Sequence, residues 1–167
     1  PVGFLLLFLT VVVYWLLNRD KRLFSIKELL VFSFSVLIVS CFWFGHETLK
    51  NGPWFLIEFV TYQLELFSEP VAGHQQPFYY HFVVVLFGCI PMSFIALPRF
   101  FKKSERDEFS FESWMKVLFW VVLILFTIVS TKIVHYSSMT YLPLSFLAAL
   151  ELNKWQDSNN RIISVLV

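Results

Sequence analysis

The residues that could do chemistry in this sequence form three short polar clusters. They are His46-Glu47, residues 74–81 and residues 131–136. In the last cluster Lys132 and Tyr136 are four residues apart, a spacing that places two side chains on one face of a helical turn. An ammonium group and a phenol hydroxyl can hold a phosphate together, because one supplies charge and the other a directed hydrogen bond. The alternative for this pair is a lysine and a tyrosine that only anchor the chain at a membrane surface.

The middle cluster combines histidines, amides and phenols. Its polar members are His74, Gln75, Gln76, Tyr79, Tyr80 and His81. A histidine with a nearby carboxylate, here Glu47 or Glu58, can hold a divalent metal ion. The sequence has no HExxH or CxxC pattern, so histidines without a metal remain the alternative. It also has no glycine-rich phosphate loop and no dinucleotide-binding fingerprint, so an enzyme acting through these clusters would use a donor other than a free nucleotide sugar.

The elements that must position these clusters are strongly apolar. The chain is 57% hydrophobic, 20% aromatic and only 15% charged, with a mean hydropathy of +0.68, whereas about a quarter of a typical soluble domain is charged. The apolar residues are also gathered in long runs, which indicates a membrane protein. The net charge of +1 gives no sign of a nucleic-acid partner.

Five apolar runs predict an all-α, polytopic transmembrane helical bundle in a single membrane domain that covers residues 1–167. The runs lie at about residues 1–17, 29–45, 79–98, 117–130 and 141–152. A helix needs about 17–25 residues to cross a bilayer, so the two shortest runs require flanking apolar residues such as Trp114 and Met115. The runs do not alternate apolar and polar residues as the strands of a membrane β-barrel do.

The basic residues alternate between the connecting segments. Segments 18–28 and 99–116 carry four and five Lys or Arg residues, whereas 46–78 and 131–140 carry one each. The positive-inside rule therefore places 18–28, 99–116 and the tail 153–161 in the cytoplasm and the other two segments outside it. We interpret the basic residues of the cytoplasmic loops through topology and contact with lipid head groups. All three polar clusters then lie on the extracytoplasmic side, as a single site requires.

The outer loop 46–78 contains a further predicted helix. Asn51, Gly52 and Pro53 indicate a helix start. From there apolar residues recur at helical spacing, and another face carries acidic residues and a tyrosine. The apolar residues are Trp54, Ile57, Val60, Leu64 and Phe67, and the polar ones are Glu58, Tyr62, Glu65 and Glu69. We predict an amphipathic helix in the membrane interface, whose acidic face is either solvated or, through Glu58, lines a substrate cavity.

Three segments resemble motifs of one family, in that family's order. The run GHQQPFYYHF at 73–82, with GCIPMS at 88–93, resembles a GHxxPFYYY…GxxPWS segment. TKIVHY at 131–136, with YLP at 141–143, resembles a TKxxxYxLP segment, and PVGF at 1–4 resembles the end of a KGPVGF segment. These motifs are typical of bacterial GT-C glycosyltransferases related to protein O-mannosyltransferases and to the lipid A aminoarabinose transferase. The resemblance covers nearly the whole chain, which is similar to an internal fragment of such an enzyme.

The resemblance implies a GT-C-type membrane fold. It also implies transfer of a sugar from a polyprenyl-phosphate carrier to a lipid, protein or glycan acceptor, on the extracytoplasmic face of the bacterial inner membrane. The family's catalytic acid precedes the segment that matches residues 1–4. The catalytic residues are therefore expected upstream of Pro1, and this fragment alone is expected to be inactive.

The resemblance also suggests roles for particular residues. Lys132 and Tyr136 match positions near the lipid phosphate, and the motif that includes Tyr79 and Tyr80 is expected to bind substrate. His74 matches a position associated with substrate or with a divalent metal.

The interfacial helix carries one match and one departure. Glu58 falls near an acidic position of the family's interfacial helix. Relatives tend to have arginine where this chain has Glu65, which puts a donor or acceptor contact in doubt.

Two other classes stay open. A membrane transporter or flippase would carry ionisable residues near mid-membrane in broken helices, and a non-catalytic membrane assembly subunit would need none. In this chain nearly all the candidate ionisable residues lie at the outer edge of the predicted spans. Glu151, close to the cytoplasmic end of a short span, is the exception. That distribution favours the enzyme.

Overall fold

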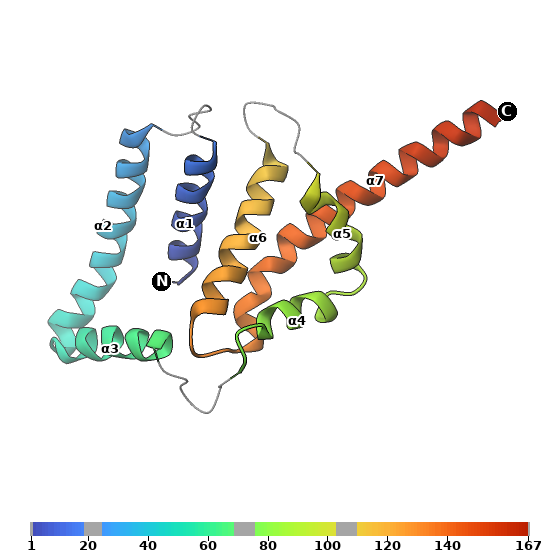
Figure 1. Ribbon diagram of the computed structural model, residues 1–167. Helices are drawn as coiled ribbons and strands as arrows, with labels where there is room; N and C mark the ends of the chain where they lie inside the picture. Colours follow the sequence, from blue (N-terminus) through green and yellow to red (C-terminus); the bar gives the residue numbers. More distant parts are fainter. Residues whose placement is uncertain (1, 19–24, 69–75, 103–109, 167) are drawn as a thin grey trace.

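The computed structural model describes residues 2–18, 25–68, 76–102 and 110–166 (Figure 1). In these ranges all regular secondary structure is helical, as the sequence predicts, and no β-strand is present. The elements are α1 (Val2–Leu17), α2 (Ile26–Asn51), α3 (Trp54–Ser68), α4 (Tyr80–Gly88), α5 (Met92–Phe101), α6 (Phe111–Ile128), the 3-10 helix η2 (Val134–Thr140) and α7 (Tyr141–Leu166).

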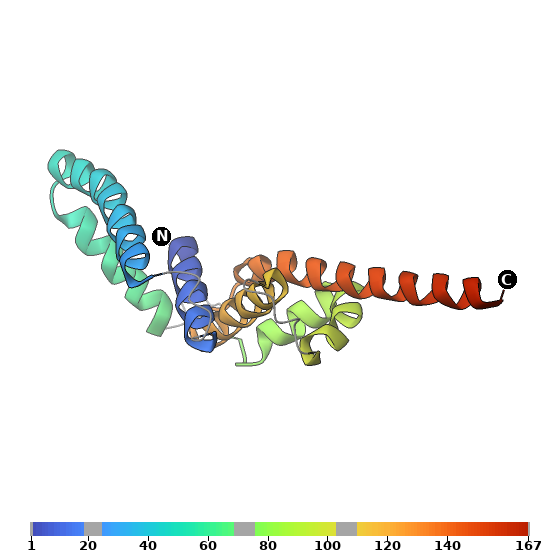
Figure 2. The same ribbon diagram turned by 90° about the horizontal axis from the view of Figure 1, so that it is seen from above.

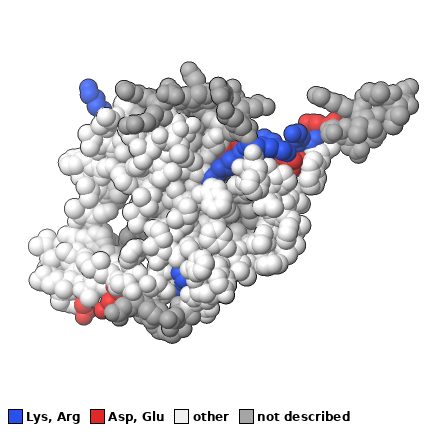
Figure 3. Space-filling model, viewed as in Figure 1, with Lys and Arg blue, Asp and Glu red and all other residues white. Residues whose placement is uncertain are grey.

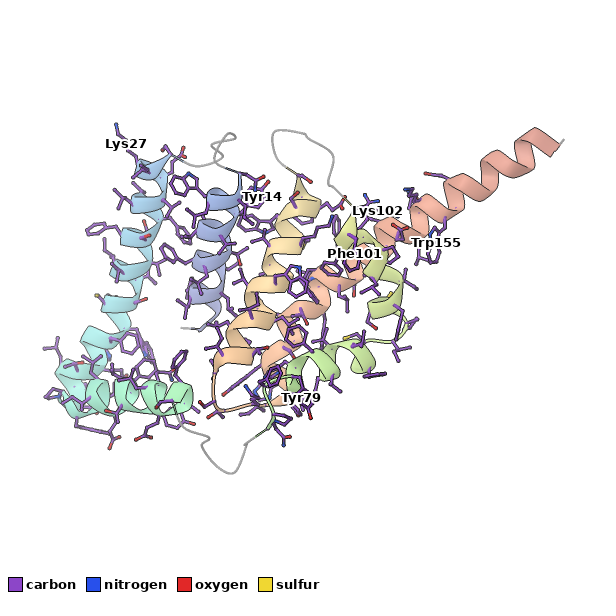
Figure 4. All side chains as sticks on the ribbon, in the orientation of Figure 1. Tyr14, Lys27, Tyr79, Phe101, Lys102 and Trp155 are labelled. Atoms are coloured by element: carbon purple, nitrogen blue, oxygen red, sulfur yellow. The ribbon has the colours of Figure 1, made fainter. Side chains whose placement is uncertain are left out.

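Tyr79 and Lys27 lie at opposite ends of the molecule (Figure 4), and we call these the Tyr79 end and the Lys27 end. The last turn of α2, helix α3, the start of α4 and the loop between α6 and α7 lie at the Tyr79 end. The starts of α2 and α6 lie at the Lys27 end, and α5 ends toward it. The described parts of the segments predicted to be extracytoplasmic therefore gather at one end.

Two helices are long and apolar enough to cross a membrane. They are α2 and α6, which contain most of the predicted runs 29–45 and 117–130. α2 begins with a capping box, in which Ser25 Oγ accepts a hydrogen bond from the Glu28 N–H while the Glu28 carboxylate accepts one from the Ser25 N–H. α1 is apolar but shorter, and α4 with α5 forms a third span only if the bent pair is counted as one. The described residues thus contain two or three candidate spans, and the other predicted spans stay predictions.

The run 79–98, predicted as one span, is broken in the structure. α4 and α5 meet at an angle of 114°. The break follows from Gly88 and Pro91, because glycine weakens a helix and proline lacks an N–H and disfavours helical geometry in the residue before it. Ser93 Oγ donates a hydrogen bond of 2.6 Å to the Leu86 carbonyl across the break, which helps to satisfy backbone that the interruption exposes. The expectation of one continuous helix was wrong, although its breakers are visible in the sequence.

α7 continues through the segment 153–161, which the sequence analysis assigns to a cytoplasmic tail. No glycine or proline follows Pro143, so no strong helix terminator comes after the apolar run 141–152. The helix projects past the others, with the C-terminus at its far end (Figure 2).

The buried apolar side chains form two clusters that share α6. One lies between α4, α5, α6 and α7 and includes Leu123 and Leu147. The other joins α1 to α6 and includes Leu6 and Val122. In a bilayer such contacts are stabilised by van der Waals packing rather than by removal of side chains from water. Because α6 takes part in both clusters, it is the element on which the others depend.

α2 stands apart from this core. None of its residues is buried, and it packs mainly on α3, where the Phe44 and Phe59 rings lie 5.1 Å apart. Seen from above, α2 and α3 lie to one side of the other helices (Figure 2). The helices thus form an open arrangement, and the loop after α6 is where its two sides meet at the Tyr79 end.

Candidate functional site

Lys132 lies in the loop after α6 and is only 5% exposed. Its Nζ atom donates hydrogen bonds of 2.8 Å to the carbonyl oxygens of Thr127 and Val129. The last carbonyls of a helix lack intrahelical partners and carry partial negative charge, so an ammonium group is favourable there. Burial lowers the pKa of Lys132 from its usual 10.5. The cap fixes the ammonium group and uses two of its three N–H donors.

Tyr136 belongs to η2 and packs on the same turn of α6. Its ring lies 5.0 Å from the Phe126 ring, tilted by 30°. Burial raises the pKa of Tyr136 and the nearby Tyr62 of α3 raises it further, so the phenol stays protonated and able to donate. Tyr136 also lines a cavity of about 490 Å³ between α1, α3 and α6. The other residues around this cavity are Leu5, Gln63, Leu64, Leu66, Phe67, Leu125, Phe126 and Val129.

The structure places Lys132 and Tyr136 on the same turn of α6, but not by the geometry that their spacing predicted. Lys132 precedes η2, so the two side chains do not share a helical face. The α6 carbonyls draw Lys132 back along the chain, while Tyr136 stacks on Phe126. The shared helical face predicted from the spacing was therefore wrong, because the residues before η2 form a loop and not a regular helical turn.

The end of α3 is joined to the same loop. The backbone N–H groups of Ser130 and Thr131 donate to the carbonyls of Phe67 and Leu66, at 3.1 and 3.3 Å. Ser130 Oγ donates to the Ser68 carbonyl at 3.0 Å. These bonds use carbonyls that the C-terminus of α3 leaves open, and they hold the last turn of α3 beside the loop that carries Lys132.

α3 begins at Trp54, as predicted, and has three faces rather than two. Partly buried residues such as Phe59 and Leu66 form a face toward the protein. The predicted apolar stripe from Trp54 to Phe67 is exposed, as suits a helix in a membrane interface. Glu58 is also exposed and lies eight residues before Leu66, about 12 Å along the helix axis. The structure therefore does not bring Glu58 to the turn that holds Lys132.

Tyr79 and Tyr80 lie at the start of α4. Tyr79 is 51% exposed, with its ring edge-on to that of Phe78 at 5.4 Å, and is open to a ligand. Tyr80 is half-buried, and its ring lies 5.3 Å from that of His81 in a T-shaped arrangement. His74, the favoured histidine of this cluster, lies outside the described residues.

His81 belongs to the middle polar cluster of the sequence, but we predicted no separate role for it. It is fully buried, and its ring lies 6.1 Å from that of Phe126. Neither ring nitrogen has a hydrogen-bond partner in the part of the chain that the structure describes. A signal was present, because His81 lies inside the predicted apolar run 79–98 and so enters the protein with α4.

The predicted metal ligands do not come together where the structure describes them. In those ranges no three His, Cys, Asp or Glu side chains gather as a metal site. His46 Nδ1 lies 3.9 Å from its neighbour Glu47, whose carboxylate also accepts a hydrogen bond of 2.7 Å from Asn51. This cluster belongs to α2 and not to the last turn of α6. The described residues thus provide no ligand set for a divalent metal.

A second charged cluster lies toward the Lys27 end. Glu112 of α6 pairs with Arg99 and with Lys116, both at 2.7 Å. Glu151 of α7 is 2% exposed and pairs with Lys102, with Arg99 3.9 Å away. Figure 3 shows basic and acidic side chains side by side along this region.

This cluster ties α5 to α6 and α7. From the sequence we explained its basic residues by topology and lipid contact alone. That explanation was incomplete, because these residues also form ion pairs. The spacing of four residues between Glu112 and Lys116 signalled one pair. The pairs to Glu151 depend on the tertiary fold and have no local signal.

Comparison with known proteins gives distant relatives. The chain is 30% identical over 155 residues to an uncharacterized protein of Aquifex aeolicus (strain VF5), covering 92% of this chain and 30% of that protein. It is 25% identical over 169 residues to the undecaprenyl phosphate-alpha-4-amino-4-deoxy-L-arabinose arabinosyl transferase of Edwardsiella ictaluri (strain 93-146), covering 98% of this chain and 30% of the transferase. The chain thus spans about a third of the length of these curated relatives. No family model matches the chain, and no solved structure matches it.

Proposed function

We propose that the chain is part of an integral-membrane glycosyltransferase of the GT-C type. The enzyme would move a sugar from a polyprenyl-phosphate carrier to a lipid, protein or glycan acceptor on the extracytoplasmic face of the bacterial inner membrane. The observation that carries the proposal is the buried ammonium group of Lys132. It caps the last turn of α6, on which Tyr136 of η2 also packs, and two hydrogen bonds use two of its three N–H donors. The similarity to an arabinosyl transferase over 98% of this chain supports it.

A phosphate on a lipid fits these surroundings. A buried charge is costly unless an opposite charge pairs with it, and an anion that arrives from the membrane would supply that partner. The cavity beside Tyr136 has mostly apolar walls, which suits the hydrocarbon next to the phosphate. Lys132 would supply the charge and Tyr136 a hydrogen bond.

The proposed reaction is an inverting transfer. The acceptor hydroxyl attacks the anomeric carbon of the sugar and gives its proton to a carboxylate, which we expect from residues upstream of Pro1. The bond between the anomeric carbon and the phosphate oxygen breaks, and the carrier leaves as polyprenyl phosphate. Lys132 and Tyr136 stabilise the charge on the departing phosphate. Tyr79 and Tyr80, at the start of α4, would contact substrate, and so would His74.

The break between α4 and α5 raises the transporter alternative again, because transporters place substrate at broken helices. The cavity of about 270 Å³ beside this break is lined by apolar residues and Ser93, with no ionisable side chain among them. It therefore offers nothing to bind an ion or a charged substrate. The glycosyltransferase remains the better proposal.

The proposed topology places the Tyr79 end outside the cytoplasm and the Lys27 end inside it. Single cysteines at Gln76 and at Lys27, both exposed positions, test this in a full-length variant whose Cys41 and Cys89 are replaced by alanine. A membrane-impermeant thiol reagent applied to intact cells should label position 76 and not position 27. The reverse pattern would remove the proposed donor, since it would turn the site to the cytoplasm.

The central test is Lys132→Ala in the full-length protein. Sugar transfer should fall by about 100-fold or more, as expected when a group that stabilises the leaving charge is removed. His46→Ala, an exposed change on α2, is the matched control and should retain activity. Membrane insertion and amount are compared by immunoblot. Unchanged transfer by a Lys132→Ala enzyme that is present at normal levels would exclude Lys132 from the site and with it this proposal.

A further inference from the structure

His81 is a buried imidazole without hydrogen bonds in the part of the chain that the structure describes. A neutral imidazole carries one N–H donor and one acceptor nitrogen. Leaving a buried polar group unpaired is costly, and such groups usually have a reason, such as a catalytic role or an ion bound at that place. Buried histidines in a protein core usually have a hydrogen-bond partner. We therefore looked for a ligand that His81 could bind.

The surroundings of His81 are those of the candidate site. α4 packs on α6 and on η2. The Phe126 ring lies near two polar side chains: its centroid is 6.1 Å from that of the His81 ring and 5.0 Å from that of the Tyr136 ring. The next residue, Thr127, accepts a hydrogen bond from Lys132, and the Lys132 charge acts on the His81 ring. Three polar side chains from α4, the loop and η2 therefore surround the last turn of α6.

The charge of this group selects the kind of ligand. Lys132 repels a cation, so a metal ion at His81 is disfavoured. The described carboxylates of α3, Glu58 and Glu65, are exposed and form no ion pair with Lys132 within the described ranges. An oxyanion is the ligand that accepts hydrogen bonds from both an imidazole N–H and an ammonium N–H.

We propose that His81 is an anion-binding residue, and that its ring N–H and the remaining Lys132 N–H bind oxygens of one phosphate group. The identity of that phosphate as the head group of a polyprenyl carrier rests on the proposed function. The inference adds a third binding residue, and it assigns His81 no proton transfer. It also explains why an unpaired imidazole is kept in an otherwise apolar contact.

The test measures the binding of two ligands that differ only in the phosphate. Purified full-length protein in detergent is titrated with undecaprenyl phosphate and with undecaprenol. His81→Phe should weaken binding of the phosphate about tenfold, the value of one hydrogen bond to a charged group, and should leave binding of the alcohol unchanged. His81→Gln keeps an N–H donor and should recover part of the loss. His46→Phe, an exposed change on α2, is the control and should bind both ligands normally.

The thermal midpoint of each variant separates binding from folding. His81→Phe should unfold no earlier than the parent, because it removes an unpaired polar group from an apolar contact. Inorganic phosphate at millimolar concentration competes for the site if the head group alone is recognised. Its failure to compete assigns recognition to the lipid-linked phosphate, and either result is consistent with the role of His81.

The remaining outcomes overturn one proposal or both. If His81→Phe binds the phosphate normally while Lys132→Ala does not, His81 has no role in binding and the proposed function stands. If His81→Phe weakens the binding of both ligands equally, His81 acts through packing and does not bind the phosphate. If the parent protein binds the phosphate and the alcohol equally well, no phosphate site exists and the proposed function fails as well.

Discussion

The two ends of α6 differ in how their charged side chains are paired. Toward the Lys27 end, Glu112 lies between two cations, and Glu151 of α7 pairs with Lys102. At the Tyr79 end, the hydrogen bonds of the Lys132 ammonium go to backbone carbonyls, and neither Lys132 nor His81 is paired with a carboxylate among the described residues. Within the described ranges, one end pairs its buried carboxylates with cations, whereas the other holds buried donors that no carboxylate pairs.

This difference separates a structural cluster from a binding site. Buried opposite charges in contact satisfy one another and fix the helices that carry them, so they need no ligand. Buried donors without an acceptor remain costly until a ligand arrives. We therefore expect the Lys27 end to serve stability and, under the proposed function, the Tyr79 end to bind substrate. Variants at the two ends should then affect different measurements.

The largest expected effect is on stability, at the paired end. Glu151→Ala removes a 2% exposed carboxylate and leaves Lys102 and Arg99 without it. The Lys102 side chain is 37% exposed and Arg99 keeps its pair with Glu112, so the loss is that of a hydrogen bond between charged groups, about 1.5–3 kcal/mol. The thermal midpoint in detergent should fall by about 5 °C. Glu65→Ala, an exposed change on α3, is the matched control. An unchanged midpoint for Glu151→Ala would mean that the cluster does not hold α5 to α7.

The next effect is on binding at the unpaired end and depends on pH. Burial lowers the pKa of Lys132 and raises that of Tyr136. The ammonium group therefore loses its proton at a lower pH than an exposed lysine does, and the phenol keeps its proton to a higher pH than an exposed tyrosine does. Affinity for polyprenyl phosphate should fall about tenfold for each pH unit above the pKa of Lys132. Lys132→Arg keeps its charge at all these pH values. A Lys132→Arg protein that still binds should show no such fall, and an identical fall in both proteins would assign it to another group.

A smaller effect is expected from the phenol. Tyr136→Phe keeps the ring that stacks on Phe126 at 5.0 Å and removes only the hydroxyl. The loss of one hydrogen bond, about 1 kcal/mol, should weaken polyprenyl phosphate binding about fivefold, without lowering the thermal midpoint. Isothermal titration with the phosphate and the alcohol measures this. A variant that binds the phosphate as tightly as the parent would limit Tyr136 to packing.

The comparison also shows what could be read from the sequence. Helix content, the start of α3 and the candidate spans α2 and α6 follow from apolar runs and start signals, because these are local properties. The break at Gly88 and Pro91 was equally local and was overlooked. The position of the Lys132 side chain could not be predicted from the local spacing, because it depends on the carbonyls at the end of α6. His81 and Glu151 were underrated for the same reason, since their surroundings come from other helices.

The smallest expected effect concerns Glu58, and it tests where the site ends. The sequence proposed Glu58 as a substrate residue, but it is exposed and about 12 Å along α3 from the turn that joins the Lys132 loop. At that distance in water its charge acts weakly on a phosphate. Glu58→Gln should therefore change affinity for polyprenyl phosphate less than about twofold, because screening reduces the interaction to a few tenths of a kcal/mol. A tenfold change would extend the site along the acidic face of α3 and restore the role predicted from the sequence. The boundary between the two ends would then no longer follow α6 alone.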